Sequence, residues 1–353
     1  MASAADLNPE SPVLGRLVQV AERRGLSGLA GALTDLSEFV SHDLSAIERE
    51  LAHTPTRADL VGKAADHLLD LKGKRIRPLC VALSARAGRG FSAHAVKLAA
   101  AVELVHSATL LHDDVIDEGE LRRGRPTSRV LFGNAASVFA GDWLLIHALR
   151  LVQAAGVEGL LDRLLQIIDE MIEAESVQLE RRGKLSADRD AYFRIIEGKT
   201  ASLFRWAMVA GGRAGGLSWS QCDALAAFGN DLGMAFQIVD DTLDLSSDTE
   251  ATGKNMFADV KEGKITYPLL VAMEREPRLL GLLEQVMDAE GEVHPETGQC
   301  IQRVLNETRA LGAALEYAHE LALRARGHLG TLPESEAKTG LDLVAEAAVR
   351  RSN

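Results

Sequence analysis

Apolar residues recur at helical spacing over long stretches of this chain, and strand-like alternation is rare. Residues 95–117 are apolar nearly all round, which is typical of a helix at the centre of a fold. Residues 188–211 and 221–244 predict two more helices, and no proline interrupts the chain between Pro126 and Pro268. The pattern therefore predicts an all-α fold.

Polar residues interrupt the apolar helix that is predicted over residues 95–117, among them Glu103, His106, Ser107 and Thr109. A polar group on such a helix must find a partner or line a cavity, because burial without a hydrogen bond is costly.

A short acidic pattern occurs twice, each time at the end of a predicted apolar helix. Residues 113–117 read DDVID, and residues 240–244 read DDTLD. Each copy places carboxylates at positions i, i+1 and i+4, and positions i and i+4 point the same way on a helix. Carboxylates gathered at one cavity would repel each other strongly unless cations neutralise them. Such hard oxygen ligands suit Mg²⁺, which bridges to substrate phosphates, so the pattern indicates an enzyme that acts on a diphosphate.

A solvated acidic patch at a helix end is the simpler interpretation, and it would be favoured for a single copy. Three carboxylates at a helix C-terminus oppose the helix dipole and need compensation. Because the same spacing recurs inside a second apolar segment, a metal site is favoured.

Basic residues flank the first acidic pattern in two places. Arg122 and Arg123 follow it in a glycine-punctuated loop, and residues 73–78 (GKRIRP) precede another apolar helix. Alone, each group would be explained by solubility or by a solvated helix cap. Beside a metal site, an arginine pair predicts a bidentate phosphate clamp.

Composition and charge narrow the classes of partner. The chain has 353 residues, of which 46% are hydrophobic, so it can bury a large core in one domain. A net charge of −12 disfavours nucleic acid. The cysteines show no metal spacing and are typical of reduced thiols in a cytoplasmic protein. No signal peptide and no integral membrane segment are predicted. Residues 1–12 are expected to be a loose tail.

These motifs, in this order, resemble the trans-isoprenyl diphosphate synthases, also called polyprenyl synthetases. The resemblance covers about residues 72–270. It implies a bundle of long helices around a deep central cavity (the isoprenoid synthase fold), a single domain over residues 13–353, and a homodimer. It also implies a prenyltransferase of isoprenoid biosynthesis with three Mg²⁺ per active site. Such an enzyme condenses isopentenyl diphosphate head-to-tail with an allylic diphosphate, makes a polyprenyl diphosphate and releases pyrophosphate.

The resemblance assigns roles to residues that match the family motifs. The metal ligands would be Asp113, Asp114, Asp117, Asp240, Asp241 and Asp244. The contacts to the allylic diphosphate would be Arg122, Lys199, Lys254 and Lys264. Thr200 and Gln237 would lie near the breaking C–O bond, and with Asp113, Asp114, Asp240 and Lys199 they form the expected catalytic set. The pocket for isopentenyl diphosphate would hold Lys74, Arg77, His106 and Arg123.

Helix geometry bears on the length of the product. On a regular helix Thr109 lies about 40° and Val102 about 20° from Asp113, so both would line the path of a growing chain. Ala108 and Thr109 are small, which leaves this path open and favours a long product. Trp206, seven places after Lys199, would either form the floor of the path or simply pack between helices. Replacing it with alanine is expected to lengthen the product if it is the floor.

Several alternatives stay open. Geranylgeranyl diphosphate is the alternative product. A class I terpene cyclase would share one DDxxD motif but needs no second diphosphate site. A non-catalytic subunit of a heteromeric synthase would have lost one or both acidic motifs, whereas this chain keeps both. Transient contact with a membrane during product release also stays open, although no basic amphipathic helix indicates it.

Overall fold

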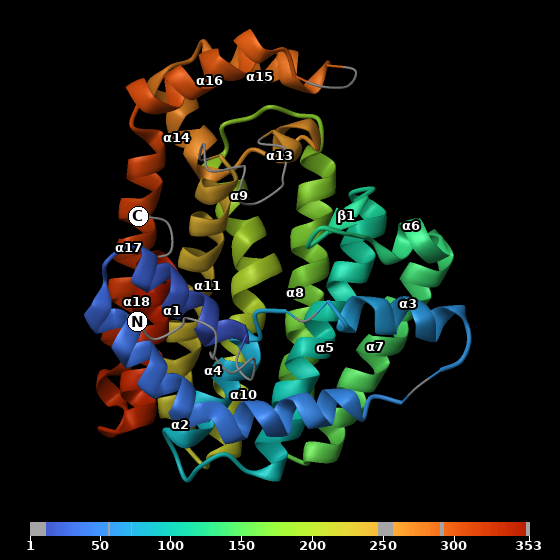
Figure 1. Ribbon diagram of the computed structural model, residues 1–353, viewed down its shortest axis with the longest axis vertical. Coiled ribbons are helices and arrows are strands. Elements are labelled where there is room, and N and C mark those ends of the chain that lie inside the picture. The colour runs from blue at the N-terminus through green and yellow to red at the C-terminus, as the bar shows by residue number, and fades with distance from the viewer. Residues whose placement is uncertain (1–11, 56, 72, 246–256, 290–292, 351–353) are drawn as a thin grey trace, which may run out of the picture. The chain divides into compact units, whose positions relative to one another are not determined.

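The structure is a computed structural model that describes residues 12–55, 57–71, 73–245, 257–289 and 293–350. It is almost entirely helical, which confirms the all-α prediction (Figure 1). The described chain divides into two compact units that interleave along the sequence. The first unit comprises the chain up to Leu164 together with Trp206–Ala226 and Leu329–Ala347, and the second comprises Leu165–Arg205, Ala227–His328 and the end of the chain.

The first unit is built around α5. Its complete helices are α1 (Pro12–Arg23), α2 (Ser27–Ala52), α3 (Leu60–Leu69), α4 (Ile76–Arg86), α5 (Ala93–Ile116), α6 (Ser128–Phe132) and α7 (Asn134–Ala155). A short hairpin of β1 (Leu121–Arg122) and β2 (Arg125–Pro126) follows α5. The 3₁₀ turn η2 (Leu329–Thr331) and most of α18 (Glu336–Arg350) also belong to this unit.

α5 and α7 pack tightly against each other along their lengths (Figure 1). A Cβ atom built on Gly141 of α7 would lie 2.3 Å from Nε2 of His112 on α5, so a larger residue here would force the His112 ring to move. The Ser92 hydroxyl accepts a hydrogen bond from the Ala95 backbone N–H and caps the start of α5. Close packing and capping together fix the helix that carries the first acidic pattern.

Four of the described helices contribute residues to both units: α8 (Leu160–Arg181), α10 (Ser202–Ala214), α11 (Trp219–Asp244) and, by its last residues, α18. The second unit adds α9 (Arg189–Ile196), the π-helical turn η1 (Glu197–Ala201), α13 (Ala258–Lys261), α14 (Tyr267–Arg275), α15 (Leu279–Met287), α16 (Pro295–Glu307) and α17 (Ala310–His328). Its core packs residues of α11, α14, α16 and α17, with Ile238, Leu269 and Ala314 fully buried.

The three helices predicted from periodicity are confirmed as α5, α11 and the run from α9 to α10. The last run differs in one respect, because a π-helical turn interrupts it at residues 197–201. The expected tail falls on residues outside the described ranges, except that Pro12 already begins α1. The single domain expected over residues 13–353 stays a prediction.

α7 is long and apolar enough to cross a membrane by length and composition alone, with a mean hydropathy of 1.4 over its most apolar window. Only 39% of that window is buried. This is weak support for a membrane span, since core helices of water-soluble proteins meet the same criterion. The low burial of α7 does mean that an apolar helix contributes exposed area to the surface of the first unit.

Candidate active site

The first acidic pattern lies on the last turn of α5 and in the cap that ends it. The backbone N–H of Gly119 donates to the Asp114 carbonyl, and that of Glu118 donates to the Val115 carbonyl. Glu118 has a φ of 51°, so the helix ends in a Schellman motif with a left-handed residue that is not glycine. The cap turns the chain sharply into the β1–β2 hairpin.

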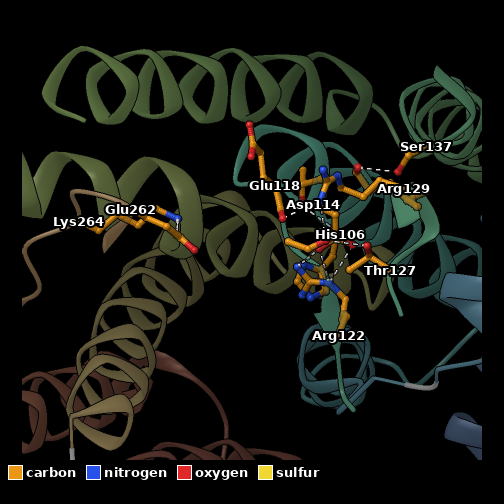
Figure 2. Close-up of polar contacts among 12 residues, drawn as sticks. His106, Asp114, Glu118, Arg122, Thr127, Arg129, Ser137, Glu262 and Lys264 are labelled. Carbon is orange, nitrogen blue, oxygen red and sulfur yellow. Dashed lines mark hydrogen bonds and ion pairs between the residues drawn. The ribbon is translucent and has the colours of Figure 1, made fainter. Parts of the chain in front are cut away.

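Arg122 reaches back from β1 to Asp114 on α5 (Figure 2). Its Nη2 lies 2.7 Å from Oδ1, and its Nε lies 3.0 Å from Oδ1 and 3.2 Å from Oδ2 of the carboxylate. Asp114 is buried, whereas Asp113 and Asp117 are half-buried. The expected clamp residue Arg122 is therefore engaged with an aspartate of the pattern itself.

The hairpin has the geometry that a two-residue type I′ turn requires. Leu121 pairs with Pro126 and Arg122 with Arg125, and the two residues between them, Arg123 and Gly124, have φ values of 53° and 75°. The sequence predicted a loop here. The short strands form because Gly124 tolerates the turn, and because the Thr127 hydroxyl and its backbone N–H bind the Gly119 and Glu120 carbonyls.

The residues predicted to bind isopentenyl diphosphate all lie in the first unit. Lys74 and Arg77 flank the start of α4, His106 lies on α5, and Arg123 lies at the hairpin turn. Burial is the main cause that lowers the pKa of His106 well below its usual value, followed by the charges of Arg77 and Arg123. His106 is therefore neutral near pH 7 and can act as a hydrogen-bonding group in a cationic neighbourhood.

The second acidic pattern ends α11, and its middle aspartate is buried. The Tyr192 hydroxyl of α9 donates to Oδ2 of Asp241 at 2.6 Å, and Nε2 of Gln237 donates to Oδ1 at 2.8 Å. Burial raises the pKa of Asp241 to about 7, and the charges of Asp259 and Asp240 add to this, while the hydrogen bonds from Tyr192 and Gln237 oppose it. Asp240 and Asp244 are half-buried.

The chain of hydrogen bonds continues from Asp241 into the π-helical turn. The Thr200 hydroxyl donates to Oε1 of Gln237 at 2.9 Å. Lys199 of the same turn places its Nζ 2.6 Å from Oε2 of Glu175 on α8. π-helical turns are rare and are often found at functional sites, and this one carries both residues that the sequence singled out.

Two of the expected contacts to the allylic diphosphate, Lys254 and Lys264, follow α11 in the chain, and the structure describes only one of them. Lys254 lies outside the described residues. Lys264 lies within them, and its Nζ is 2.7 Å from a carboxylate oxygen of Glu262 (Figure 2). Both roles in binding diphosphate stay predictions.

The residues proposed to set product length are all in the first unit. Val102 and Ala108 are buried on α5, and the Thr109 hydroxyl donates to the His106 carbonyl at 2.8 Å. Trp206 is 2% exposed, and its Nε1 donates to the Leu160 carbonyl at 3.1 Å. This contact favours packing as the role of Trp206. The expectation that Trp206 shares a helix face with Lys199 assumed a regular α-helix between them. The π-helical turn at residues 197–201 changes the angle between these two side chains around the helix axis.

The donor atoms of the two patterns fit Mg²⁺. Within the described ranges, no group of three His, Cys, Asp or Glu side chains could hold a metal by itself. Mg²⁺ commonly uses one or two carboxylates and completes its shell with water and substrate phosphates. The raised pKa of Asp241 is consistent with this, because a nearby cation would stabilise its charged form. The patterns therefore fit ions that bind together with a diphosphate.

The structure also brings forward residues that the sequence analysis did not assign to the site. Tyr192 contacts Asp241 from 49 positions away, and Glu175 contacts Lys199 from 24 positions away. No local pattern marks either contact. Arg75 pairs with the buried Glu103. The sequence did indicate that Glu103 needs a partner or a cavity, because it interrupts an apolar helix.

Comparisons with known proteins show the family and the fold of this chain. The family model described as polyprenyl synthetase matches residues 58–304. The chain is 34% identical over 323 residues to an octaprenyl diphosphate synthase of Haemophilus influenzae, covering 91% of this chain and 98% of that protein. A decaprenyl diphosphate synthase structure from Rhodobacter capsulatus superposes with a TM-score of 0.83 at 32% identity, covering 91% of this chain and 99% of the other. A polyprenyl synthase from Caulobacter crescentus, complexed with calcium and isoprenyl diphosphate, has a TM-score of 0.80 at 33% identity over 98% of this chain and 100% of its own.

Proposed function

Because the chain belongs to the polyprenyl synthetase family, we propose that it is a long-chain polyprenyl diphosphate synthase. It is a prenyltransferase, and in this proposal it joins isopentenyl diphosphate to an allylic diphosphate and releases pyrophosphate. One observation carries the proposal. Each of two acidic patterns ends a long helix with one aspartate buried and held by protein hydrogen bonds, and with its other aspartates half-buried.

The cofactor in this proposal is Mg²⁺, with three ions per active site as in the family. Asp113, Asp117, Asp240 and Asp244 would hold the ions, and Asp114 and Asp241 complete the set. The bound ions would neutralise the charge of the diphosphate. The calcium in the Caulobacter crescentus structure supports a divalent cation in the family.

The chain's own residues then act on the allylic substrate. Lys199 and Arg122 would bind the diphosphate. Their positive charges would stabilise the negative charge that develops on the leaving oxygen as the C–O bond breaks. The Thr200 hydroxyl and the Gln237 amide form a linked polar pair, 2.9 Å apart. Their oxygen dipoles would stabilise the allylic cation without forming a bond to it.

Isopentenyl diphosphate would occupy the cationic group of Lys74, Arg77, His106 and Arg123. Two features of this group support an anionic ligand. Arg77 lies in the first turn of α4, where a cation opposes the helix dipole unless an anion is present. The pKa of His106, lowered mainly by burial and then by nearby arginines, leaves a neutral donor that does not add to the repulsion. The double bond of isopentenyl diphosphate attacks the allylic cation, and the proton that is then lost passes to the departing pyrophosphate.

A long product is proposed over geranylgeranyl diphosphate, the alternative. The small side chains of Ala108 and Thr109 support it, because they add little bulk to α5 at the positions five and four residues before Asp113. The names of two relatives support it as well: an octaprenyl diphosphate synthase of Haemophilus influenzae and a decaprenyl diphosphate synthase of Rhodobacter capsulatus.

A homodimer is proposed because each unit has exposed apolar side chains, and those of the first unit lie on α6 and α7. On α7, Phe139 and Ile146 are 60% and 49% exposed and lie seven positions apart, so they share one face. Val130 and Leu131 of α6 are also exposed. In the second unit, Leu165, Ile172 and Leu179 repeat every seven positions along α8. Exposed apolar patches of this kind mark interfaces, and a second copy of the chain is the proposed occupant.

The test is a product assay with purified protein, Mg²⁺, labelled isopentenyl diphosphate and an allylic primer, followed by mass analysis of chain length. Asp113→Ala and Asp240→Ala should each lower kcat by at least about a hundredfold while the protein stays folded. Cyclic hydrocarbon formed from an allylic diphosphate alone would instead favour a terpene cyclase. Near-normal kcat in a folded double variant would reject the proposal.

A further inference from the structure

A buried ion pair involves Arg75, which lies in the chain between Lys74 and Arg77, two residues predicted to bind isopentenyl diphosphate. Nη1 of Arg75 lies 2.6 Å from Oε1 of Glu103, and both side chains are less than a tenth exposed. Nε of Arg75 also lies 2.7 Å from Oε1 of Glu48 on α2. Glu103 is one of the polar residues of the apolar helix α5 to which the proposed function assigns no role.

The backbone at Arg75 is held in an uncommon conformation. Its φ is 47° and its ψ is 28°, which is the left-handed region that residues with a Cβ seldom adopt. Conformations of this kind cost about 1 kcal/mol or more and persist where the surroundings determine them. Just before α4 begins, the Lys74 side chain is exposed and the next side chain, that of Arg75, is buried. The left-handed backbone at Arg75 therefore accompanies a change from an exposed to a buried side chain.

The Glu103 carboxylate also lies close to Gly73, in the segment just before α4. A Cβ atom built on Gly73 would lie 3.0 Å from Oε1 of Glu103 and 3.2 Å from Nη2 of Arg123. Nη1 of Arg123 donates to the Leu71 carbonyl at 3.1 Å. Arg123 therefore binds Leu71, and Glu103 binds Arg75 and lies close to Gly73, so Glu103 holds residues 73–75 before α4.

We propose that Arg75 and Glu103 are a positioning pair, which fixes the loop before α4 so that Lys74 and Arg77 converge on the diphosphate of isopentenyl diphosphate. The inference rests on the proposed function, because it takes Lys74 and Arg77 as contacts to that substrate. The Arg75 side chain itself is buried and paired with Glu103 and Glu48. The pair therefore acts through the position of its neighbours and does not touch the substrate.

The test compares Glu103→Gln with Asp43→Asn. Asp43 is also buried and pairs with an arginine of α4, Arg86, at the opposite end of that helix, which makes it a matched control for the loss of a buried ion pair. Glu103→Gln should raise the KM for isopentenyl diphosphate by about tenfold and leave kcat and the KM of the allylic primer within about threefold. Asp43→Asn should leave all three constants unchanged.

A double variant separates positioning from stability. Replacing both members, Arg75→Met with Glu103→Leu, removes the unpaired charge and should restore most of the thermal stability that Glu103→Gln loses. The KM for isopentenyl diphosphate should stay raised, because the loop is no longer held. Recovery of KM together with stability, or an equal rise of KM in Asp43→Asn, would overturn the inference. If Glu103→Gln does not fold, Arg75→Lys, which keeps the charge but loses the two-armed contact, takes its place.

Calorimetry with isopentenyl diphosphate alone keeps the inference separate from the proposed function. A wild-type protein that binds this ligand, with binding about tenfold weaker in Glu103→Gln, supports the positioning pair even without turnover. Equal binding by the two proteins overturns the positioning pair alone. A wild-type protein that neither binds nor consumes isopentenyl diphosphate overturns both.

Discussion

The Tyr192 hydroxyl donates a hydrogen bond to Oδ2 of Asp241 at 2.6 Å, and both residues are buried. Tyr192 stacks on Tyr267, which itself packs against Tyr317, so its ring is held in an aromatic cluster of α9, α14 and α17. The middle aspartate of the second acidic pattern is thus oriented by a residue that lies far away in the sequence.

Tyr192→Phe removes this hydrogen bond and keeps the ring. We expect the Mg²⁺ concentration for half-maximal activity to rise by about tenfold or more, since groups that orient metal ligands commonly contribute this much to metal affinity. Titration of activity and of thermal stability with Mg²⁺ in the presence of pyrophosphate measures the shift. Tyr317→Phe is the matched control in the same cluster and should not change the Mg²⁺ requirement. An equal effect in both variants would mean that the cluster acts only on stability.

The stability of the metal-free protein should depend on pH through Asp241. Its pKa in the folded state is raised to about 7, mainly by burial, whereas an unfolded aspartate titrates near about 3.9. The folded state therefore keeps the proton more tightly, so this contribution is full below about pH 4 and is lost as pH rises through about 7. The slope is at most about 1.4 kcal/mol per pH unit.

Thermal unfolding in a chelator between pH 5.5 and 8.5 tests this, with Asp241→Asn as the reference that cannot titrate. As pH rises, the Tm of the wild type should fall relative to the Tm of Asp241→Asn. With Mg²⁺ and pyrophosphate the trend should reverse, because metal binding requires the charged carboxylate. Parallel Tm curves in the chelator would contradict the prediction.

Arg122 compensates the buried charge of Asp114. Arg122→Leu leaves that carboxylate without its bidentate partner, and we expect a loss of about 3 kcal/mol in the free energy of unfolding. Adding Asp114→Asn should recover more than half of this loss, because the buried charge is then gone. Urea unfolding measures both. Arg125→Leu is the control, since Arg125 pairs with Arg122 across the hairpin but is exposed. A similar loss in the control would assign the effect to the hairpin and not to the ion pair.

The exposed face of α7 predicts the oligomeric state. Phe139→Glu combined with Ile146→Glu places two charges where the proposed second copy packs, so the protein should become monomeric. Light scattering after size-exclusion chromatography gives the mass directly. Leu323→Glu is the control, because Leu323 is also an apolar residue that is 50% exposed but belongs to α17 and not to α7. A wild-type monomer, or a dimer that survives both charges, would reject α7 as the interface.

The local features of this protein were predictable because neighbouring residues produce them. Apolar spacing predicted α5 and α11, and the DDxxD spacing placed both acidic patterns at their ends, since helix periodicity is a property of adjacent turns. The polar character of Glu103 on an apolar helix likewise indicated that its side chain would find a partner or line a cavity. The resemblance to a family then added the roles of single residues, most of which stay predictions.

Tertiary structure alone decided which partner each polar group meets. Asp241 is held by Tyr192, Lys199 by Glu175, and Glu103 by Arg75, and each contact joins separate helices or a helix and a loop. Such pairings depend on how helices pack, and packing is set by shape and burial summed over many distant residues. The π-helical turn at residues 197–201 has the same origin, since its single extra residue is tolerated only where the surrounding contacts favour it.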